Sequence, residues 1–199
     1  MIRFDGSVNM QLPDSERLGL VASDHEIFLV ARSTAPGLQY LIDDDQADSH
    51  HHGLRINDGA GATFIPHAPV ELIDDDRADA GVVGQFSDGM PHLFGMLVSH
   101  DVGSLFVDGV LSPDVVRSAV SSTKTGLVLG SDFNLSEGFV GDIAEVLMYS
   151  RGLTGAERAQ VQTYLAGRWD IVLVPEPSAH LLLLWATPLL LLTYARRSR

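Results

Sequence analysis

The chain has no cysteine among its 199 residues. This absence excludes a disulfide framework, a thiolate metal site and a cysteine nucleophile, so packing alone must stabilise the fold. Basic residues are also scarce. Three of the 13 basic residues and one of the 26 acidic residues lie in 175–199. The body of the chain, residues 1–174, therefore has 10 basic and 25 acidic residues and a net charge of −15. Such a surface repels phosphates, so we expect no nucleic-acid partner.

Recognisable catalytic patterns are missing as well. The sequence has no nucleophile elbow, phosphate-binding loop or dinucleotide-binding glycine pattern. A glycoside hydrolase needs two carboxylates that face one cleft. Asp142 and Glu145 are three residues apart, which a regular strand places on opposite faces. The sequence therefore predicts a protein that is not an enzyme.

The N-terminus lacks the basic and then apolar segment of an export signal. Residues 1–6 instead run directly into what we interpret as the first strand. Since the other end of the chain predicts export, we expect the true start to lie further upstream.

From Met1 to about Met148 the sequence is typical of β-structure, with short apolar runs between clusters of Gly, Pro, Asp and Asn. Ile27–Ala31 is one such run. Asp108-Gly109 between apolar flanks predicts a tight type I′ hairpin turn. Strands at this spacing, with no helical pattern between them, indicate an antiparallel sandwich of about 170 residues and one core.

One helix is expected after these strands. Thr154 and Glu157 have the spacing of a capping box, and apolar residues from Ala156 to Leu165 follow at helical intervals. Gly167 is a plausible end of the helix, and residues 168–174 are expected to form the last strand.

Together these segments resemble the concanavalin A-like, laminin G-like jelly-roll sandwiches. The resemblance rests on Ile2–Gly6, Leu105–Gly109, Leu127–Asp132 and, most specifically, Phe139–Trp169. It implies an all-β, antiparallel jelly-roll β-sandwich over residues 1–173, with one short late helix. It also implies a module that binds glycans or proteins.

The last 26 residues, 174–199, have a different character. A Pro-Glu-Pro-Ser turn precedes an apolar run from Ala179 to Ala195 and a basic end. This run of 17 mostly apolar residues spans about 25 Å as a helix, just enough to cross a hydrocarbon core of about 30 Å. The arginines are expected to stay in the cytoplasm, which places the body outside.

This tail resembles the PEP-CTERM sorting signal of exopolysaccharide-producing bacteria. The matching positions are the box at 174–178, the transmembrane helix at 179–195 and the basic tail at 196–199 (Val174, Pro175, Glu176, Pro177, Ser178, Arg196, Arg197 and Arg199). The resemblance implies a partner, an exosortase-type membrane protease. It also implies export, anchoring in the inner membrane, and processing to the cell surface or the extracellular space. An ordinary membrane anchor is the alternative.

An acidic sequence occurs twice. Leu41–Asp48 recurs almost unchanged as Leu72–Asp79, 31 residues later. Carboxylates at alternate positions can chelate calcium, and many laminin G-like domains hold calcium at a loop rim, so the candidate ligands are Asp43, Asp45, Asp74 and Asp76. No EF-hand or nonapeptide calcium pattern is present, which favours two solvated acidic strand ends.

Two other groups are considered as sites. The three adjacent histidines at 50–52 alternate in direction along an extended chain, so they are not expected to share one metal ion. Trp169 is the bulkiest aromatic candidate for a sugar platform, followed by Tyr40 and Tyr149, but its place after the helix favours core packing.

The sequence as a whole predicts an exported, non-catalytic cell-surface or extracellular-matrix protein. Its expected ligand is an extracellular polysaccharide or a surface protein. Two alternatives remain: an extracellular glycan-active hydrolase with an atypical site, and a purely structural matrix spacer.

Overall fold

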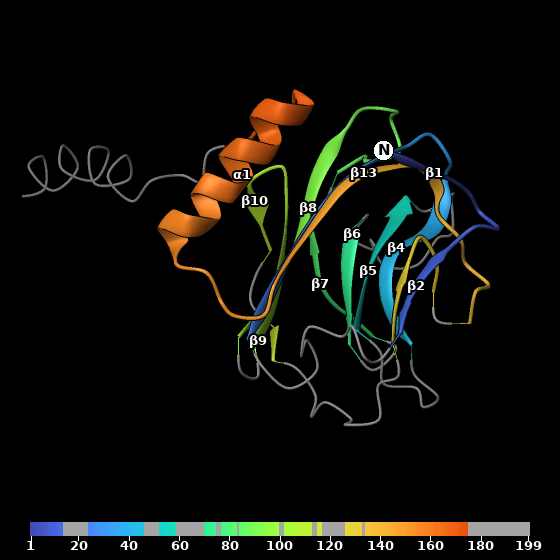
Figure 1. Cartoon of the computed structure of the whole chain (residues 1–199), viewed down its shortest axis with the longest axis horizontal. Helices are drawn as coiled ribbons and strands as arrows, with labels where there is room; N and C mark the ends of the chain where they lie inside the picture. The colour runs from blue at the N-terminus through green and yellow to red at the C-terminus, as the bar shows by residue number, and fades with distance from the viewer. Residues whose placement is uncertain are drawn as a thin grey trace, which may run out of the picture.

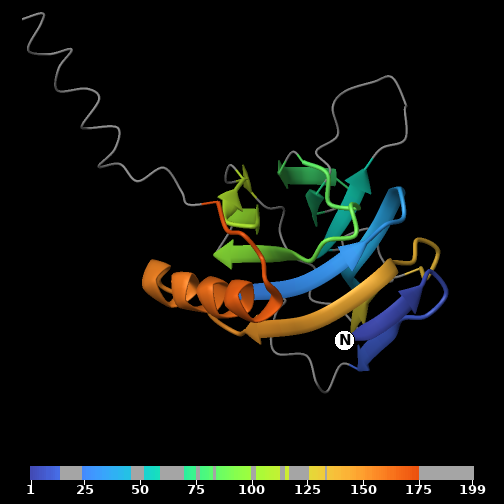
Figure 2. The same cartoon turned by 90° about the horizontal axis from the view of Figure 1, so that it is seen from above.

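Two antiparallel β-sheets lie face to face, and a helix covers the outer face of one of them (Figures 1 and 2). This arrangement is seen in a computed structural model, which describes residues 1–13, 24–45, 52–58, 70–74, 77–82, 84–99, 102–112, 115–116, 126–132 and 134–174. The expectation of an antiparallel β-sandwich with one short helix is confirmed for this part of the chain.

Among the described residues, the first sheet has seven strands and the second has six. Those of the first sheet are, in spatial order, β1 (Ile2–Asp5), β13 (Val140–Tyr149), β3 (His25–Ser33), β8 (His92–Ser99), β9 (Val102–Val107) and β10 (Val110–Leu111), with β11 (Val115–Val116) also paired to β9. Those of the second sheet are β2 (Met10–Pro13), β12 (Gly126–Leu129), β4 (Gly37–Asp45), β5 (His52–Asp58), β6 (Val70–Asp74) and β7 (Arg77–Val82).

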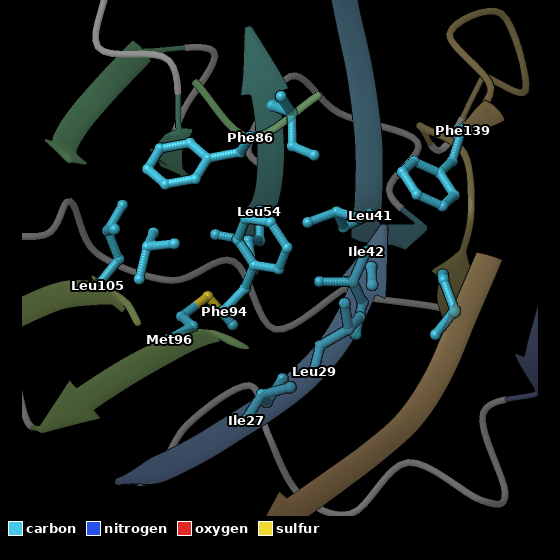
Figure 3. Close-up of a cluster of buried hydrophobic side chains, with 14 of the residues drawn as sticks. Ile27, Leu29, Leu41, Ile42, Leu54, Phe86, Phe94, Met96, Leu105 and Phe139 are labelled. Atoms are coloured by element: carbon cyan, nitrogen blue, oxygen red, sulfur yellow. The ribbon is translucent and has the colours of Figure 1, made fainter. Parts of the chain in front are cut away.

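The main core fills the space between the sheets (Figure 3). Strand β3 explains why its apolar run is unbroken. Ile27, Leu29 and Ala31 point into this core, whereas Phe28 and Val30 point outward to a second cluster beneath the helix. A strand that is buried on both faces needs apolar residues at every position.

The helix α1 (Gly155–Trp169) begins with the expected capping box. The Thr154 side chain accepts a hydrogen bond from the Glu157 amide, and the Glu157 carboxylate accepts one from the Thr154 amide. The helix does not end at Gly167. It continues to Trp169 and ends at Asp170, which has a left-handed conformation with φ 57° and whose N–H donates to the Ala166 carbonyl.

Residues 171–174 do not form the expected last strand. They run as an extended strap without sheet pairing, because Ile171 and Leu173 pack into the cluster under the helix. The prediction of a strand from this apolar segment was therefore wrong.

The hairpin turn at Asp108-Gly109 is confirmed. Both residues have positive φ, 50° and 88°, and Val107 pairs with Val110 across the turn. These are the conformations that a two-residue type I′ turn requires.

A β-bulge in β13 corrects another expectation. The pairing with β3 shifts between Ile143 and Glu145, so Asp142 stands opposite Arg32 and Glu145 opposite Val30. Both partners point to the outer face of the first sheet. Asp142 and Glu145 thus share one face, because the extra residue reverses the alternation of the strand.

Within the described residues, the structure holds no helix that is long and apolar enough to cross a membrane. The predicted membrane span, 179–195, and the basic tail, 196–199, lie outside the described residues.

Candidate functional site

Tyr40 and Arg55 meet on the outer face of the second sheet. They are paired across β4 and β5, while the neighbouring Ile42 and Leu54 point into the core. An Arg55 N–H donates to the Tyr40 hydroxyl at 3.2 Å, and the guanidinium carbon lies 5.7 Å from the ring centroid. Burial raises the pKa of Tyr40 to about 12. The phenol therefore stays neutral and supports the half-buried guanidinium.

The loop between β12 and β13 brings an acidic residue to this pair. Asp132, which is buried, organises the loop by accepting the amides of Ser136 at 2.6 Å and Glu137 at 2.8 Å, together with the Ser136 hydroxyl at 2.7 Å. Burial opposes ionisation of Asp132, but these hydrogen bonds outweigh it and lower its pKa. The turn is therefore fixed by an ionised carboxylate.

Glu137 is the unusual member of this group. Its side chain is half-buried, and its carboxylate makes no hydrogen bond with any described residue. Desolvation and the nearby charge of Asp132 raise its pKa, against the opposing effect of Arg55. Solvent still reaches this carboxylate, because it is not among the buried side-chain atoms without a hydrogen-bond partner. Groups with a pKa shifted by their surroundings are concentrated at functional sites.

A groove of about 270 Å³ beside α1 is a second candidate site. At its floor the Arg158 guanidinium donates to both Glu26 carboxylate oxygens, at 2.6 and 3.0 Å, and the Leu153 amide donates to one of them at 2.8 Å. Glu26 is buried, and both of its oxygens are already occupied. This pair joins the helix to β3, so its first role is structural.

The carboxylates of Asp142 and Glu145 are also engaged. Arg3 and Arg32 both donate to Asp142, at 2.8 to 2.9 Å, and the Arg3 hydrogen bond is the main reason that the pKa of Asp142 falls to about 2. Glu145 accepts the Trp169 indole N–H at 2.9 Å and pairs with Arg168 at 3.2 Å. Sharing a face therefore does not make them a free acid pair.

His92 joins the start of β8 to the hairpin turn. Its Nδ1 lies 2.6 Å from an Asp108 oxygen and its Nε2 lies 3.1 Å from Asp88, while the Leu93 amide donates to the other Asp108 oxygen at 2.7 Å. Burial lowers the pKa of His92, but the hydrogen bonds and charges of the two aspartates outweigh it, so the pKa is raised overall. We call these three side chains the His92 clasp.

The structure places the predicted calcium ligands only in part. Asp43 is fully buried and pairs with Gly53 across β4 and β5. A Cβ atom added at Gly53 would lie only 2.8 Å from the Asp43 Oδ1 atom. Asp45 and Asp74 are the last residues of β4 and β6, but their side chains, like Asp76 and residues 50–51, lie outside the described set.

The two acidic segments reach the same edge of the second sheet, because β4 and β6 flank β5 and run in the same direction. The two segments are offset by one residue in the register. Gly53 pairs with Asp43 on one side and with Ile73 on the other, so Asp43 is aligned with Ile73 rather than with Asp74. No group of three His, Asp or Glu among the described residues has the geometry to hold a metal ion. Calcium binding stays a prediction.

The aromatic candidates pack against the body. Trp169 and Tyr149 are partly buried in the cluster under the helix, and Tyr40 is buried on the second sheet. Of the sorting motif, only Val174 lies within the described residues.

Sequence reasoning missed Arg55, Asp132 and Glu137. Arg55 and Glu137 are 82 positions apart, and a lone glutamate in a polar loop carries no local signal. The Ser and Asp residues that precede Glu137 (Ser131, Asp132 and Ser136) indicate a turn at this position, but they do not indicate a binding site.

The fold is similar to several solved structures. One is domain 4 of AbnA, a GH43 extracellular arabinanase from Geobacillus stearothermophilus, in complex with arabinotriose (TM-score 0.59, 14% identity, 80% of this chain and 75% of that chain). Another is the CBM40 of the Ruminococcus gnavus IT-sialidase bound to α2,3 sialyllactose (TM-score 0.55, 13% identity, 81% of this chain and 94% of that chain). A third comprises domains LG4-5 of the mouse laminin α1 chain (TM-score 0.51, 18% identity, 76% of this chain and 42% of that chain).

This chain also spans only 26% to 27% of several sialidase chains that it matches. No protein-family model and no curated protein matches the sequence. At 10% to 18% identity the structural similarities establish the fold alone. They agree with the expected resemblance in fold: the chain is a β-sandwich similar to those of the laminin and CBM40 domains.

Proposed function

We propose that the protein is a non-catalytic carbohydrate-binding module that is exported and presented outside the cell. The observation that carries this proposal is the half-buried Glu137 carboxylate, which has no hydrogen-bond donor among the described residues and lies under the influence of Arg55. A sugar presents neighbouring hydroxyl groups that can donate to the carboxylate and accept from the guanidinium at the same time.

The position of this site suits a surface module. It lies on the outer face of the second sheet, whereas α1 covers the first sheet. Tyr40 holds the Arg55 guanidinium, and Asp132 holds the backbone of the loop that carries Glu137, so the site is partly ordered before a ligand binds.

Two neighbours were solved with sugars, arabinotriose and α2,3 sialyllactose. These sugars are the starting probes. Because the body carries a net charge of −15, it repels anionic saccharides, and we expect the ligand to be neutral.

The test is a calorimetric titration of arabinotriose and of sialyllactose into the protein. We expect binding of the neutral sugar, and Glu137→Gln or Arg55→Gln should each weaken it by about tenfold, the effect of losing ~1.4 kcal/mol. Asp170→Asn is the matched control, because it removes the same charge on the helix side and asparagine tolerates a left-handed conformation. Equal affinity in all variants would exclude this site, and no binding of either sugar, with or without calcium, would contradict the neutral-glycan proposal.

The engaged carboxylates of Asp142 and Glu145 support a non-catalytic role. The alternative, a glycan-active hydrolase, would show itself by release of reducing sugar from a bound oligosaccharide.

The C-terminal tail supports export. Its apolar run and arginines suit an anchor in the inner membrane, and its box suits an exosortase-type protease that releases the body to the surface.

A further inference from the structure

The last described residue, Val174, is held at one fixed point, the β9–β10 hairpin. The Val174 amide donates to the Asp108 carbonyl at 2.7 Å. Gly109 permits this contact, since a Cβ atom there would lie 2.5 Å from the Val174 carbonyl oxygen. Ile171 and Leu173 hold the preceding strap against the cluster under α1. Val174, which immediately precedes Pro175, therefore has a defined position beside the hairpin.

The surface around this point is apolar. Val110 and Leu111 follow the turn and are 41% and 43% exposed, while Val172 and Val174 in the strap are 85% and 52% exposed. We call these four side chains the exit face. They lie within three residues of the contact between Asp108 and Val174, at the outer strand of the first sheet. Val110 and Leu111 point to opposite sides of this edge strand, since Val110 pairs with Val107 of the main core and Leu111 pairs with Phe106 of the cluster under the helix. Neighbouring exposed apolar side chains of this kind mark interaction surfaces.

The chain beyond the exit face limits what can cover it. Ala179, where the apolar run begins, is five residues after Val174. Even fully extended, five residues span at most about 18 Å, and the headgroup layer on each side of a bilayer takes up about 5 to 7 Å of that length. If the run from Ala179 lies in the membrane, the exit face is confined close to the lipid surface.

We propose that the exit face rests on the lipid surface while the protein is anchored. This inference depends on the membrane anchoring included in the proposed function. The loop with Glu137 lies at the far end of the body from β10 in both views (Figures 1 and 2). The same orientation therefore turns the proposed glycan site away from the membrane.

The absence of cysteine makes a direct test simple, because a single introduced cysteine is a unique labelling site. Nitroxide labels are attached to Val110→Cys and Val172→Cys in the full chain, which is reconstituted in phosphatidylcholine vesicles and purified by flotation. Val140→Cys is the matched control: it is also a strand valine, is 39% exposed, and lies on β13 beside β1. Power saturation then compares relaxation by oxygen, which concentrates in lipid, with relaxation by a water-soluble nickel complex.

The expected result is a several-fold higher ratio of oxygen to nickel relaxation at positions 110 and 172 than at position 140. Val172 is in the strap and pairs with no strand, so its label reports on the same face with little risk to folding. Equal ratios at all three positions in vesicles that float with the protein would overturn the docking inference and leave the anchor intact. Protein that fails to float would overturn both the anchor and the docking, and would leave glycan binding unaffected.

Discussion

At the scale of single residues, the His92 clasp links stability to pH. Two aspartates face the imidazole, and the pKa of His92 is raised above its ordinary value of 6.5. The imidazolium form is therefore favoured by folding. Its contribution is complete below about pH 6.5 and is lost as the pH rises through the folded-state pKa.

We predict that His92→Gln lowers the free energy of unfolding by about 1.5 kcal/mol at pH 6, the cost of losing charge-assisted hydrogen bonds. The variant should also lose the decline in stability that we expect of the unmodified protein as the pH rises above 6.5, through the raised folded-state pKa of His92. Urea denaturation at a series of pH values measures both effects. An unchanged pH profile in the variant would show that the clasp does not hold the imidazolium form.

At the scale of elements, one ion pair attaches the helix to the sandwich. Glu26 is buried on β3, whereas the Arg158 side chain on α1 is 28% exposed. The carboxylate also accepts the Leu153 amide just before the helix, so one side chain holds both the helix and the loop that leads into it.

We predict that Glu26→Gln lowers the free energy of unfolding by about 3 kcal/mol, because it leaves the charge of Arg158 unpaired. This value is the low end of the range for breaking a buried ion pair, since solvent reaches the Arg158 side chain. The double variant Glu26→Gln with Arg158→Met should recover part of this loss, since it removes the unpaired charge. Chemical denaturation measures both variants, and Arg168→Met on the exposed side of the helix is the control. A double variant less stable than Glu26→Gln would show that Arg158 acts through packing rather than charge.

At the scale of the whole molecule, the net charge of −15 on residues 1–174 opposes compactness. Raising the salt concentration from about 0.01 M to about 0.1 M shortens the Debye length from about 30 Å to about 10 Å. We predict that the melting temperature of a chain truncated after Val174 rises over this range, as scanning calorimetry can measure. A fall would mean that local ion pairs such as Arg3–Asp142 outweigh the overall repulsion.

Several features of the fold follow from the sequence because they depend on short-range rules. The hairpin turn needs only Asp108-Gly109, whose positive φ angles suit those residues, and the capping box needs only Thr154 and Glu157. The apolar run Ile27–Ala31 was enough to predict a strand, and the structure shows that this strand is buried on both faces. The order of such local signals was enough to predict a β-sandwich.

The candidate site depended on the tertiary structure. Arg55 and Glu137 come near each other only because β5 and the β12–β13 loop meet at one side of the second sheet. The bulge in β13 placed Asp142 and Glu145 on one face, and packing under the helix turned residues 171–174 into a strap rather than a strand. The hairpin turn and the N-terminal capping box are local, so the sequence determines them, whereas the helix end at Asp170 was not predicted. Register, bulges and the neighbours of a side chain depend on how distant segments pack, and only the folded chain decides these.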